Sequence, residues 1–203
     1  MTGLFSDVYY EVERDAEFVL RERGSKFFAF VYGVKSDQDI KEKLEGLKRQ
    51  YPDATHHCYA WVMGARGEAQ RANDDGEPSN SAGRPILRSI ISVGVTNVVV
   101  VVVRYFGGTL LGIPGLIESY GEAAESALRA AGRLEKFIEE TYEISSAFEH
   151  EQEIHRLIAK YGARVLGSEY TEQVCYRVAV KAGVGRDFEN ALFDHYQLSG
   201  KRM

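Results

Sequence analysis

The residues best suited to chemistry in this sequence lie in one short stretch, residues 73–87, which reads NDDGEPSNSAGRPIL. It contains three carboxylates, Asp74, Asp75 and Glu77, together with two prolines, two glycines and an arginine. Carboxylates gathered in this way bind magnesium or act as a general acid or base. Asp-Asp-Gly followed by Pro78 is also a strong turn signal, and composition alone favours a solvated turn over a catalytic site.

A second candidate site is the glycine-rich stretch RYFGGTLLGIPGL, residues 104–116. It runs from a valine-rich segment through glycines into a helical pattern, an arrangement that builds anion sites from backbone N–H groups and a helix N-terminus. Gly107 and Gly112 have the spacing of a phosphate-binding loop, but Ile113-Pro114 stands where that loop needs Lys-Ser/Thr. The stretch is therefore not an ordinary nucleoside-triphosphate site, and a tight strand-to-helix turn explains it equally well.

The segment His56-His57-Cys58 carries the side chains that bind zinc most often. Neighbouring side chains on a strand point to opposite faces, so only His56 and Cys58 could share an ion. The sequence has no second Cys/His cluster, and we expect no metal and no cofactor. It also lacks a nucleophile elbow, a zinc-protease helix motif and a dinucleotide fingerprint, so no residue is assigned a catalytic role.

Composition narrows the class of protein. The chain has 203 residues, 44% of them hydrophobic and 27% charged, with a net charge of −5. An acidic protein does not bind nucleic acid unspecifically over its whole surface, so contact with RNA would need a local patch of basic residues. The longest apolar run, residues 98–103, is far shorter than the roughly 20 residues of a membrane helix. With only two cysteines and no apolar run at the start, we expect a cytoplasmic protein without a signal peptide or a membrane anchor.

In the first two thirds of the chain, hydrophobic periodicity predicts strands and helices in alternation. Ser36 is expected to cap the first helix, Pro85 to lie in the first turn of the second, and Gly132 to end the third in a left-handed conformation. The stretch of six valines indicates a strand that is buried on both faces. The predicted elements are a hairpin at 7–20, strands at 26–34, 55–63 and 97–105, a loop at 66–80, and helices at 36–50, 82–93 and 114–131.

The last third of the chain has a different character, and we place the domain boundary near Gly132. The periodicity predicts strands at 137–148, 163–170 and 174–180, and helices at 149–161 and 186–196. This β-α-β-β-α order is the plan of a split βαβ, or ferredoxin-like, domain whose final strand is short or absent.

Four segments, in this order, resemble the motifs of the IMPACT/YigZ family: SKFFAFVYGV, DATHHCYAW, DDGEPSNSAGRPIL and VVVRYFGGTLLGIPGLIESYGEA. The resemblance covers essentially the whole chain, and it implies a two-domain α+β protein. The implied N-terminal domain, residues 1–132, resembles the second domain of a small-subunit ribosomal protein, a β-sheet with helices on one face. The implied C-terminal domain, residues 133–203, resembles the ferredoxin-like domain V of elongation factor G.

The same resemblance implies a function in translation. The eukaryotic member of the family regulates translation initiation by competing for a partner of a stress-activated kinase, and ribosome or nucleic-acid binding has been proposed for bacterial members. We expect a translation-associated regulatory or binding protein whose partner is the ribosome, RNA or a translation-regulatory protein. The alternative is a small-molecule enzyme, a hydrolase or phosphate-ligand-binding protein, that uses Asp74, Asp75 or Glu77 together with the glycine loop.

Two motif positions depart from the family pattern. Asn80-Ser81 stands where the family usually has Gly-Thr, and asparagine is the non-glycine residue that best tolerates a left-handed conformation. Pro114 stands where the family often has glycine, which removes one N–H from any anion site.

We expect the Asp-Asp-Gly turn to bring Arg84 and Arg104 to the glycine loop, with the acids orienting the arginines. Alternatively, Arg104 forms a buried structural ion pair with Asp74 or Asp75. The predicted ligand-binding residues are Asp74, Asp75, Glu77, Arg84, Arg104, Tyr105, Gly107 and Gly108.

Overall fold

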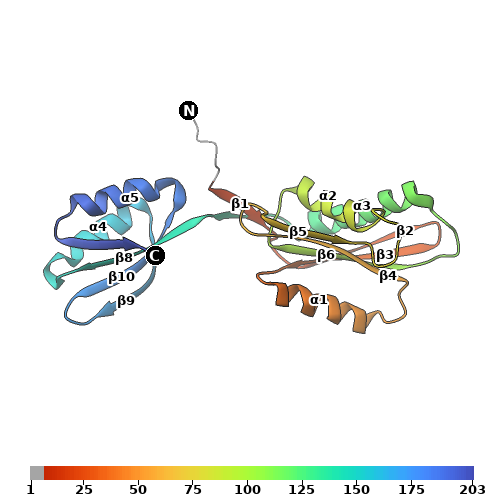
Figure 1. Ribbon diagram of the computed structural model, residues 1–203, viewed down its shortest axis with the longest axis horizontal. Helices are drawn as coiled ribbons and strands as arrows, with labels where there is room; N and C mark the ends of the chain where they lie inside the picture. The colour runs from red at the N-terminus through yellow and green to blue at the C-terminus, as the bar shows by residue number, and fades with distance from the viewer. Residues whose placement is uncertain (1–6) are drawn as a thin grey trace, which may run out of the picture. The chain divides into compact units, whose positions relative to one another are not determined.

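The computed structural model describes residues 7–203, which divide into two compact units (Figure 1). Residues 9–136 form the N-terminal unit, and residues 137–203 form the C-terminal unit together with residues 7 and 8. Both units combine helices with sheets, which confirms the predicted two-domain α+β class. Within the described residues, no helix has the length and the hydrophobicity that crossing a bilayer requires.

A five-stranded antiparallel sheet is the centre of the N-terminal unit. Its strand order is β2-β3-β6-β4-β5, so β6 is the central strand although it comes last in the chain. The strands are β2 (Ala16–Glu22), β3 (Ser25–Gly33), β4 (His56–Met63), β5 (Ala69–Asn73) and β6 (Val98–Tyr105).

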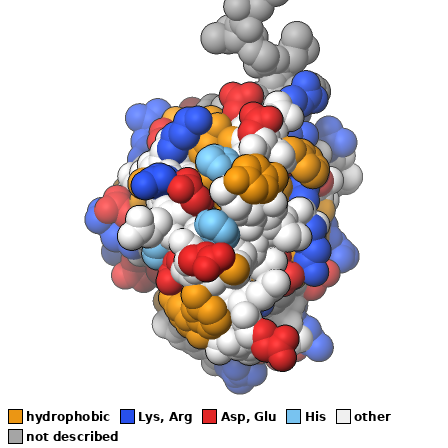
Figure 2. All heavy atoms as spheres, turned by 90° about the vertical axis from the view of Figure 1, so that its left-hand side faces the viewer, with side chains coloured by type: hydrophobic (Ala, Val, Ile, Leu, Met, Phe, Trp, Pro, Cys, Tyr) orange, Lys and Arg blue, Asp and Glu red, His pale blue; other side chains and the backbone are white. Residues whose placement is uncertain are grey.

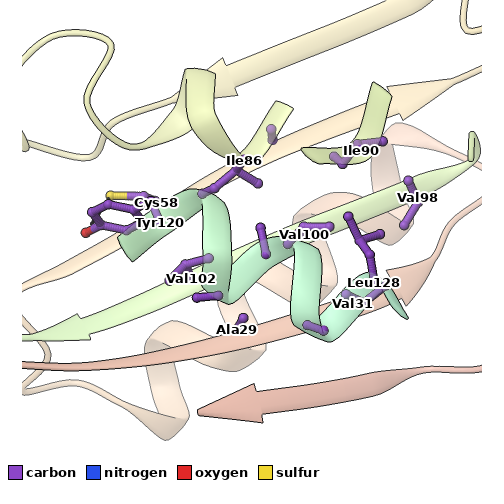
Figure 3. Close-up of a cluster of buried hydrophobic side chains, with 14 of the residues drawn as sticks. Ala29, Val31, Cys58, Ile86, Ile90, Val98, Val100, Val102, Tyr120 and Leu128 are labelled. Carbon is purple, nitrogen blue, oxygen red and sulfur yellow. Dashed lines mark hydrogen bonds between the residues drawn. The ribbon is translucent and has the colours of Figure 1, made fainter. Parts of the chain in front are cut away.

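Helices cover both faces of this sheet, because the six valines of β6 point alternately to the two sides and all are fully buried. Helices α2 (Gly83–Val93) and α3 (Gly112–Ala131) pack on one face, over the cluster drawn in Figure 3. Helix α1 (Asp37–Gln50) packs on the other face. The expectation of helices on a single face of the sheet is therefore wrong. Burying a valine side chain contributes about 1.5–3 kcal/mol, and the valines of β6 project from both faces, so helices pack on both faces.

Local signals in the sequence explain where the helices begin and end. Ser36 caps α1 as predicted, and its hydroxyl accepts the N–H of Asp39 while the Asp39 carboxylate accepts the N–H of Ser36. Helix α3 begins two residues before the predicted start, and Gly132 follows its end with a φ of 72°. The start of α1 and the end of α3 depend on neighbouring residues, so the sequence alone locates them, whereas the start of α3 differs from its expected position.

Two strand predictions are wrong because strand pairing depends on distant parts of the chain. The expected hairpin at residues 7–20 does not form: β1 (Val8–Glu11) pairs with β7 (Leu134–Phe137), and β2 pairs with β3. The predicted loop at 66–80 contains β5, which pairs antiparallel with β4. Its sequence, AQRAN, has no β-branched or aromatic residue, so the pairing with β4 rather than intrinsic propensity makes it a strand.

The C-terminal unit has the ferredoxin-like plan that the sequence predicts. Its four strands have the order β11-β8-β10-β9, and α4 and α5 cover one face through a core that includes Tyr142, Ile154 and Phe188. The final strand is present but short. The elements are β8 (Glu139–Ser146), a 3-10 turn (Phe148–His150), α4 (Glu151–Tyr161), β9 (Arg164–Tyr170), β10 (Val174–Lys181), α5 (Ala182–Asp194) and β11 (Leu198–Arg202).

The surface carries charges of both signs. Figure 2 shows one face of the molecule, on which acidic, basic and histidine side chains are interspersed with apolar ones. A protein that coats nucleic acid has a surface potential that is positive throughout, and this face, with charges of both signs, does not have one.

The N-terminal unit encloses two of its own hydrophobic clusters, one on each face of its sheet. We therefore predict that a fragment of residues 1–136 folds without the rest of the chain. Thermal unfolding followed by circular dichroism should show one cooperative transition. A broad transition in a fragment that binds a hydrophobic dye would contradict a domain boundary in the region of Gly132.

Candidate functional site

A depression of about 400 Å³ lies where the acidic loop meets the end of β6 and the start of α3. We name it the β6–α3 depression. Its walls include the apolar side chains of Phe106, Leu110 and Ile113, which are 46%, 83% and 53% exposed. Its lining also includes Glu77 and Arg104, which are almost completely buried. An apolar rim therefore surrounds a charged base.

Arg104 and Glu77 form a buried ion pair at this base. Arg104 Nη1 donates to Glu77 Oε1 at 2.6 Å, and the two residues are only 5% and 8% exposed. Desolvating two charges offsets much of their attraction, but removing one partner leaves the other charge buried and alone. The two side chains consequently depend on each other.

The Glu77 carboxylate is also hydrogen-bonded into the core. Tyr120 donates its hydroxyl to Glu77 Oε1 at 2.8 Å, and the thiol of Cys58 lies 3.3 Å from the Tyr120 oxygen. Cys58 and Tyr120 are neighbours at one end of the apolar cluster in Figure 3. Burial raises the pKa of the Cys58 thiol and that of the Tyr120 phenol far above their usual values. Both groups stay protonated near neutral pH, and Cys58, which is fully buried, lacks the thiolate character and the exposure that mark a reactive cysteine.

The other end of the guanidinium faces the first residue of β3. Arg104 Nη2 lies 3.4 Å from the Ser25 hydroxyl oxygen, and the same oxygen accepts the N–H of Gly107 at 3.2 Å. A side chain at Gly107 would overlap the backbone of Gly24, because a Cβ built there lies 1.9 Å from the Gly24 carbonyl carbon. Glycine is therefore required at this position. The Ser25 hydroxyl contacts both Arg104 and Gly107, and so links the arginine to the glycine loop.

The two aspartates of the acidic loop bind backbone N–H groups instead of the arginine. Asp74 accepts the N–H groups of Asn80, Ala82 and Gly83, and so fixes the loop to the start of α2. Asp75 accepts the N–H of His57 at 2.7 Å. The predicted ion pair of Arg104 with Asp74 or Asp75 is therefore wrong, because both carboxylates have backbone partners and Glu77 is the acid that reaches the guanidinium.

The left-handed conformation expected at Asn80 is observed, with a φ of 62°, and Asp75 has a φ of 41°. Asparagine and aspartate are the non-glycine residues that adopt this conformation most readily. Among residues 7–203, no three or more His, Cys, Asp or Glu side chains lie so that they could hold a metal ion.

The other predicted site residues lie apart from the ion pair. Arg84 is exposed in the first turn of α2 and does not line the depression. Tyr105 points to the opposite face of the sheet, where its hydroxyl donates to Asp53 at 2.9 Å. Gly108 has a φ of 86°, and a Cβ built there would point into open space. Of the eight predicted residues, only Glu77 and Arg104 line the depression.

His56 also lines the depression, although its sequence context with His57 and Cys58 suggests only a metal ligand. It lies directly opposite Arg104 in the register of β4 and β6, so both side chains point to the same face. Its Nδ1 lies 2.7 Å from the Asp75 carbonyl oxygen, which only accepts, so Nδ1 carries a proton. Its Nε2 lies 3.8 Å from Glu77 Oε1. The pairing of the two strands is the signal that would have revealed this residue.

Comparisons with known proteins give a consistent result. Residues 23–128 match the family described as the Impact N-terminal domain. IMPACT family member YigZ of Escherichia coli is 34% identical over 172 residues, which are 84% of this chain and 84% of that protein. IMPACT family member YvyE of Bacillus subtilis is 37% identical over 128 residues, 63% of this chain and 59% of that protein. A crystal structure titled as a hypothetical protein superposes with a TM-score of 0.70 at 29% identity, covering 98% of each chain.

We predict that Arg104→Ala lowers the free energy of unfolding by about 3–5 kcal/mol, because it leaves the Glu77 carboxylate buried without its cation. Chemical denaturation followed by tryptophan fluorescence measures this change. Arg84→Ala is the matched control, since an exposed arginine on α2 should change stability by less than about 0.5 kcal/mol. Equal stability of the two variants would show that the ion pair does not hold the site together.

Proposed function

This chain belongs to the IMPACT family, and from that premise we propose that it is a translation-associated binding protein whose docking site is the β6–α3 depression. The proposed occupant is a segment of a translation-regulatory protein that inserts an apolar side chain into the depression. The observation that carries this proposal is the exposed apolar rim around a charged base that is already neutralised by its own ion pair.

The rim favours a protein partner. Leu110 and Ile113 are large apolar residues that lie on the surface beside a hollow, and exposed apolar groups around a hollow are typical of protein interaction sites. An inserted side chain would be surrounded by Phe106, Leu110 and Leu116, so that water is excluded from the contact. Binding energy in such a site comes from a few buried apolar anchors.

The charged floor of the β6–α3 depression does not favour binding of a phosphate group. The Arg104 guanidinium is occupied by Glu77 and the chain carries a net charge of −5. Pro114 contributes no N–H in the first turn of α3, which weakens the helix N-terminus as an anion site. The depression therefore suits an uncharged or weakly polar group rather than the backbone of RNA.

The link to translation comes from the family, since regulation of translation initiation is what the motif resemblance implies for its eukaryotic member. Curated relatives include Protein IMPACT of Danio rerio, 28% identical over 134 residues, which are 58% of this chain and 42% of that protein. A partner among initiation or ribosome-associated proteins would place the chain in the cytoplasm.

A small-molecule enzyme is the second candidate function. It is favoured by one observation: His56 and Glu77, two residues suited to acid–base catalysis, converge at the base of a hollow of about 400 Å³. Glu77 already accepts hydrogen bonds from Arg104 and Tyr120, which gives it a structural role before any catalytic one.

We predict that Leu110→Glu lowers partner capture by at least about tenfold, because it places a charge on the apolar rim. The tagged protein is incubated with native lysate, and initiation factors and ribosomal fractions are quantified separately by mass spectrometry. Ile91→Glu is the matched control, since Ile91 is an exposed apolar residue of α2 that does not line the depression.

The proposal further requires that the purified protein changes the yield of a cell-free translation reaction, and that Leu110→Glu abolishes this effect while Ile91→Glu preserves it. Equal capture by the two variants, or capture without any translation protein, would refute it. Turnover of a small phosphorylated compound that His56→Ala abolishes would support the enzyme instead.

A further inference from the structure

A second hollow lies on the opposite face of the same sheet, between α1 and the strands β4 and β5. It has a volume of about 560 Å³, within the range of roughly 300–1,000 Å³ that is common for ligand sites. Helix α1 lies on this face of the sheet (Figure 1). Its side chains Ile40 and Leu47 join the cluster formed by β3 and β6. The part of this face formed by β4 and β5 stays only partly covered. We name this hollow the α1–β5 groove.

Two aromatic side chains line the floor of the groove. Tyr59 and Trp61 are separated by one residue on β4, so their side chains project from the same face, and both are half-buried. Within residues 7–203, neither ring makes a stacked or edge-on contact with another aromatic ring. Phe28 and Phe30 of the same cluster, by contrast, pack against Tyr51. Both rings pack against this cluster on one side, and the part of each that stays exposed lines the groove, where a planar ligand can stack on it.

Basic side chains flank these rings. Lys41 and Lys48 of α1 lie seven residues apart, two turns along one side of the helix, and both line the groove. Arg71 of β5 lies directly opposite Trp61 in the strand register. Positive charges thus border the two aromatic rings on the helix side and on the strand side.

The acids in the lining do not cancel this charge. Asp37 and Glu45 are the two acidic lining residues, against three basic ones, so the groove has an excess of one positive charge in a chain of net charge −5. Glu45 lies 4.0 Å from the nitrogens of both Lys41 and Arg49, while Asp37 occupies the first turn of α1, where it favours the helix dipole. Lys41 is thus partly paired, whereas Lys48 and Arg71 form no ion pair within residues 7–203 and supply the positive charge that RNA contact requires of an acidic protein.

We propose that the α1–β5 groove binds single-stranded RNA, with unpaired bases stacked on Trp61 and Tyr59 and phosphates held by Lys41, Lys48 and Arg71. Adjacent aromatic rings and flanking cations are the two components with which proteins hold unpaired strands. A duplex does not fit, because its bases are already stacked on each other. This site goes beyond the proposed protein docking site, from which it is separated by the sheet.

Trp61 is the single tryptophan of the chain, so fluorescence excited selectively in tryptophan and not in the 12 tyrosines reports on the groove. A ten-nucleotide single-stranded RNA of mixed sequence should quench this fluorescence, and the same RNA paired with its complement should not. Three phosphate contacts, at about 0.7 each for a single strand, give a slope near 2 for log affinity against log salt. Absence of quenching at low salt would overturn the proposal.

Substitutions locate the binding. With a fluorescein-labelled copy of the RNA and anisotropy as the readout, Trp61→Ala should weaken binding by about 5- to 150-fold, the loss of one base stack. Trp61→Phe keeps an aromatic ring and should retain most of the affinity, which separates stacking from a folding defect. Lys48→Gln should lower the salt slope by about 0.7, whereas Arg88→Gln on α2, the exposed control on the opposite face, should leave it unchanged.

The two sites are distinguished by their own variants. Leu110→Glu should leave RNA binding intact, so a failure of the protein docking site does not affect this result. If Leu110→Glu abolishes RNA binding while Trp61→Ala preserves it, RNA binds in the β6–α3 depression and the groove proposal is wrong. An equal loss in Lys48→Gln and Arg88→Gln would show unspecific attraction to the surface and would also overturn it.

Discussion

The buried ion pair between Arg104 and Glu77 is the interaction on which the rest of the N-terminal site depends. It joins three segments that are distant in the chain: the acidic loop, the end of the central strand and, through Ser25, the start of β3. A charge in this position is stable only with its partner, so the loop that carries Glu77 and the strand that carries Arg104 must fold together. The close contact of Gly107 with Gly24 completes the base, and the apolar rim then forms a hollow above it.

A single sheet presents two chemically different surfaces because side chains alternate along its strands. On the face of α2 and α3, alternation brings Arg104 and His56 together beneath the glycine loop. On the face of α1 it places the half-buried rings of Tyr59 and Trp61 beside lysines. The valines of β6 fill both sides between these surfaces and keep them apart. An acidic protein can in this way offer an apolar docking site and a local basic groove without a basic surface overall.

Much of the fold could be predicted from local signals. The Ser36 cap, the valine strand and the ferredoxin-like order of the C-terminal elements all follow from residues close together in the sequence. The errors share one physical cause, which is pairing across long distances. The partner of β1, the strand character of β5 and the choice of Glu77 over Asp74 and Asp75 are decided by contacts that no local pattern encodes. The acidic loop stands out in the sequence by its composition, but the partners of its three carboxylates are visible only in the structure.

A double-mutant cycle on Arg104→Met and Glu77→Gln tests the central claim most directly. The free energy of unfolding is measured for the wild type, both single variants and the double variant. Each single variant should be strongly destabilised, and the double variant much less than their sum predicts, with a coupling energy of about 2–3 kcal/mol. Losses that add to within about 0.5 kcal/mol would show that the two residues act independently, and that the ion pair does not organise the site.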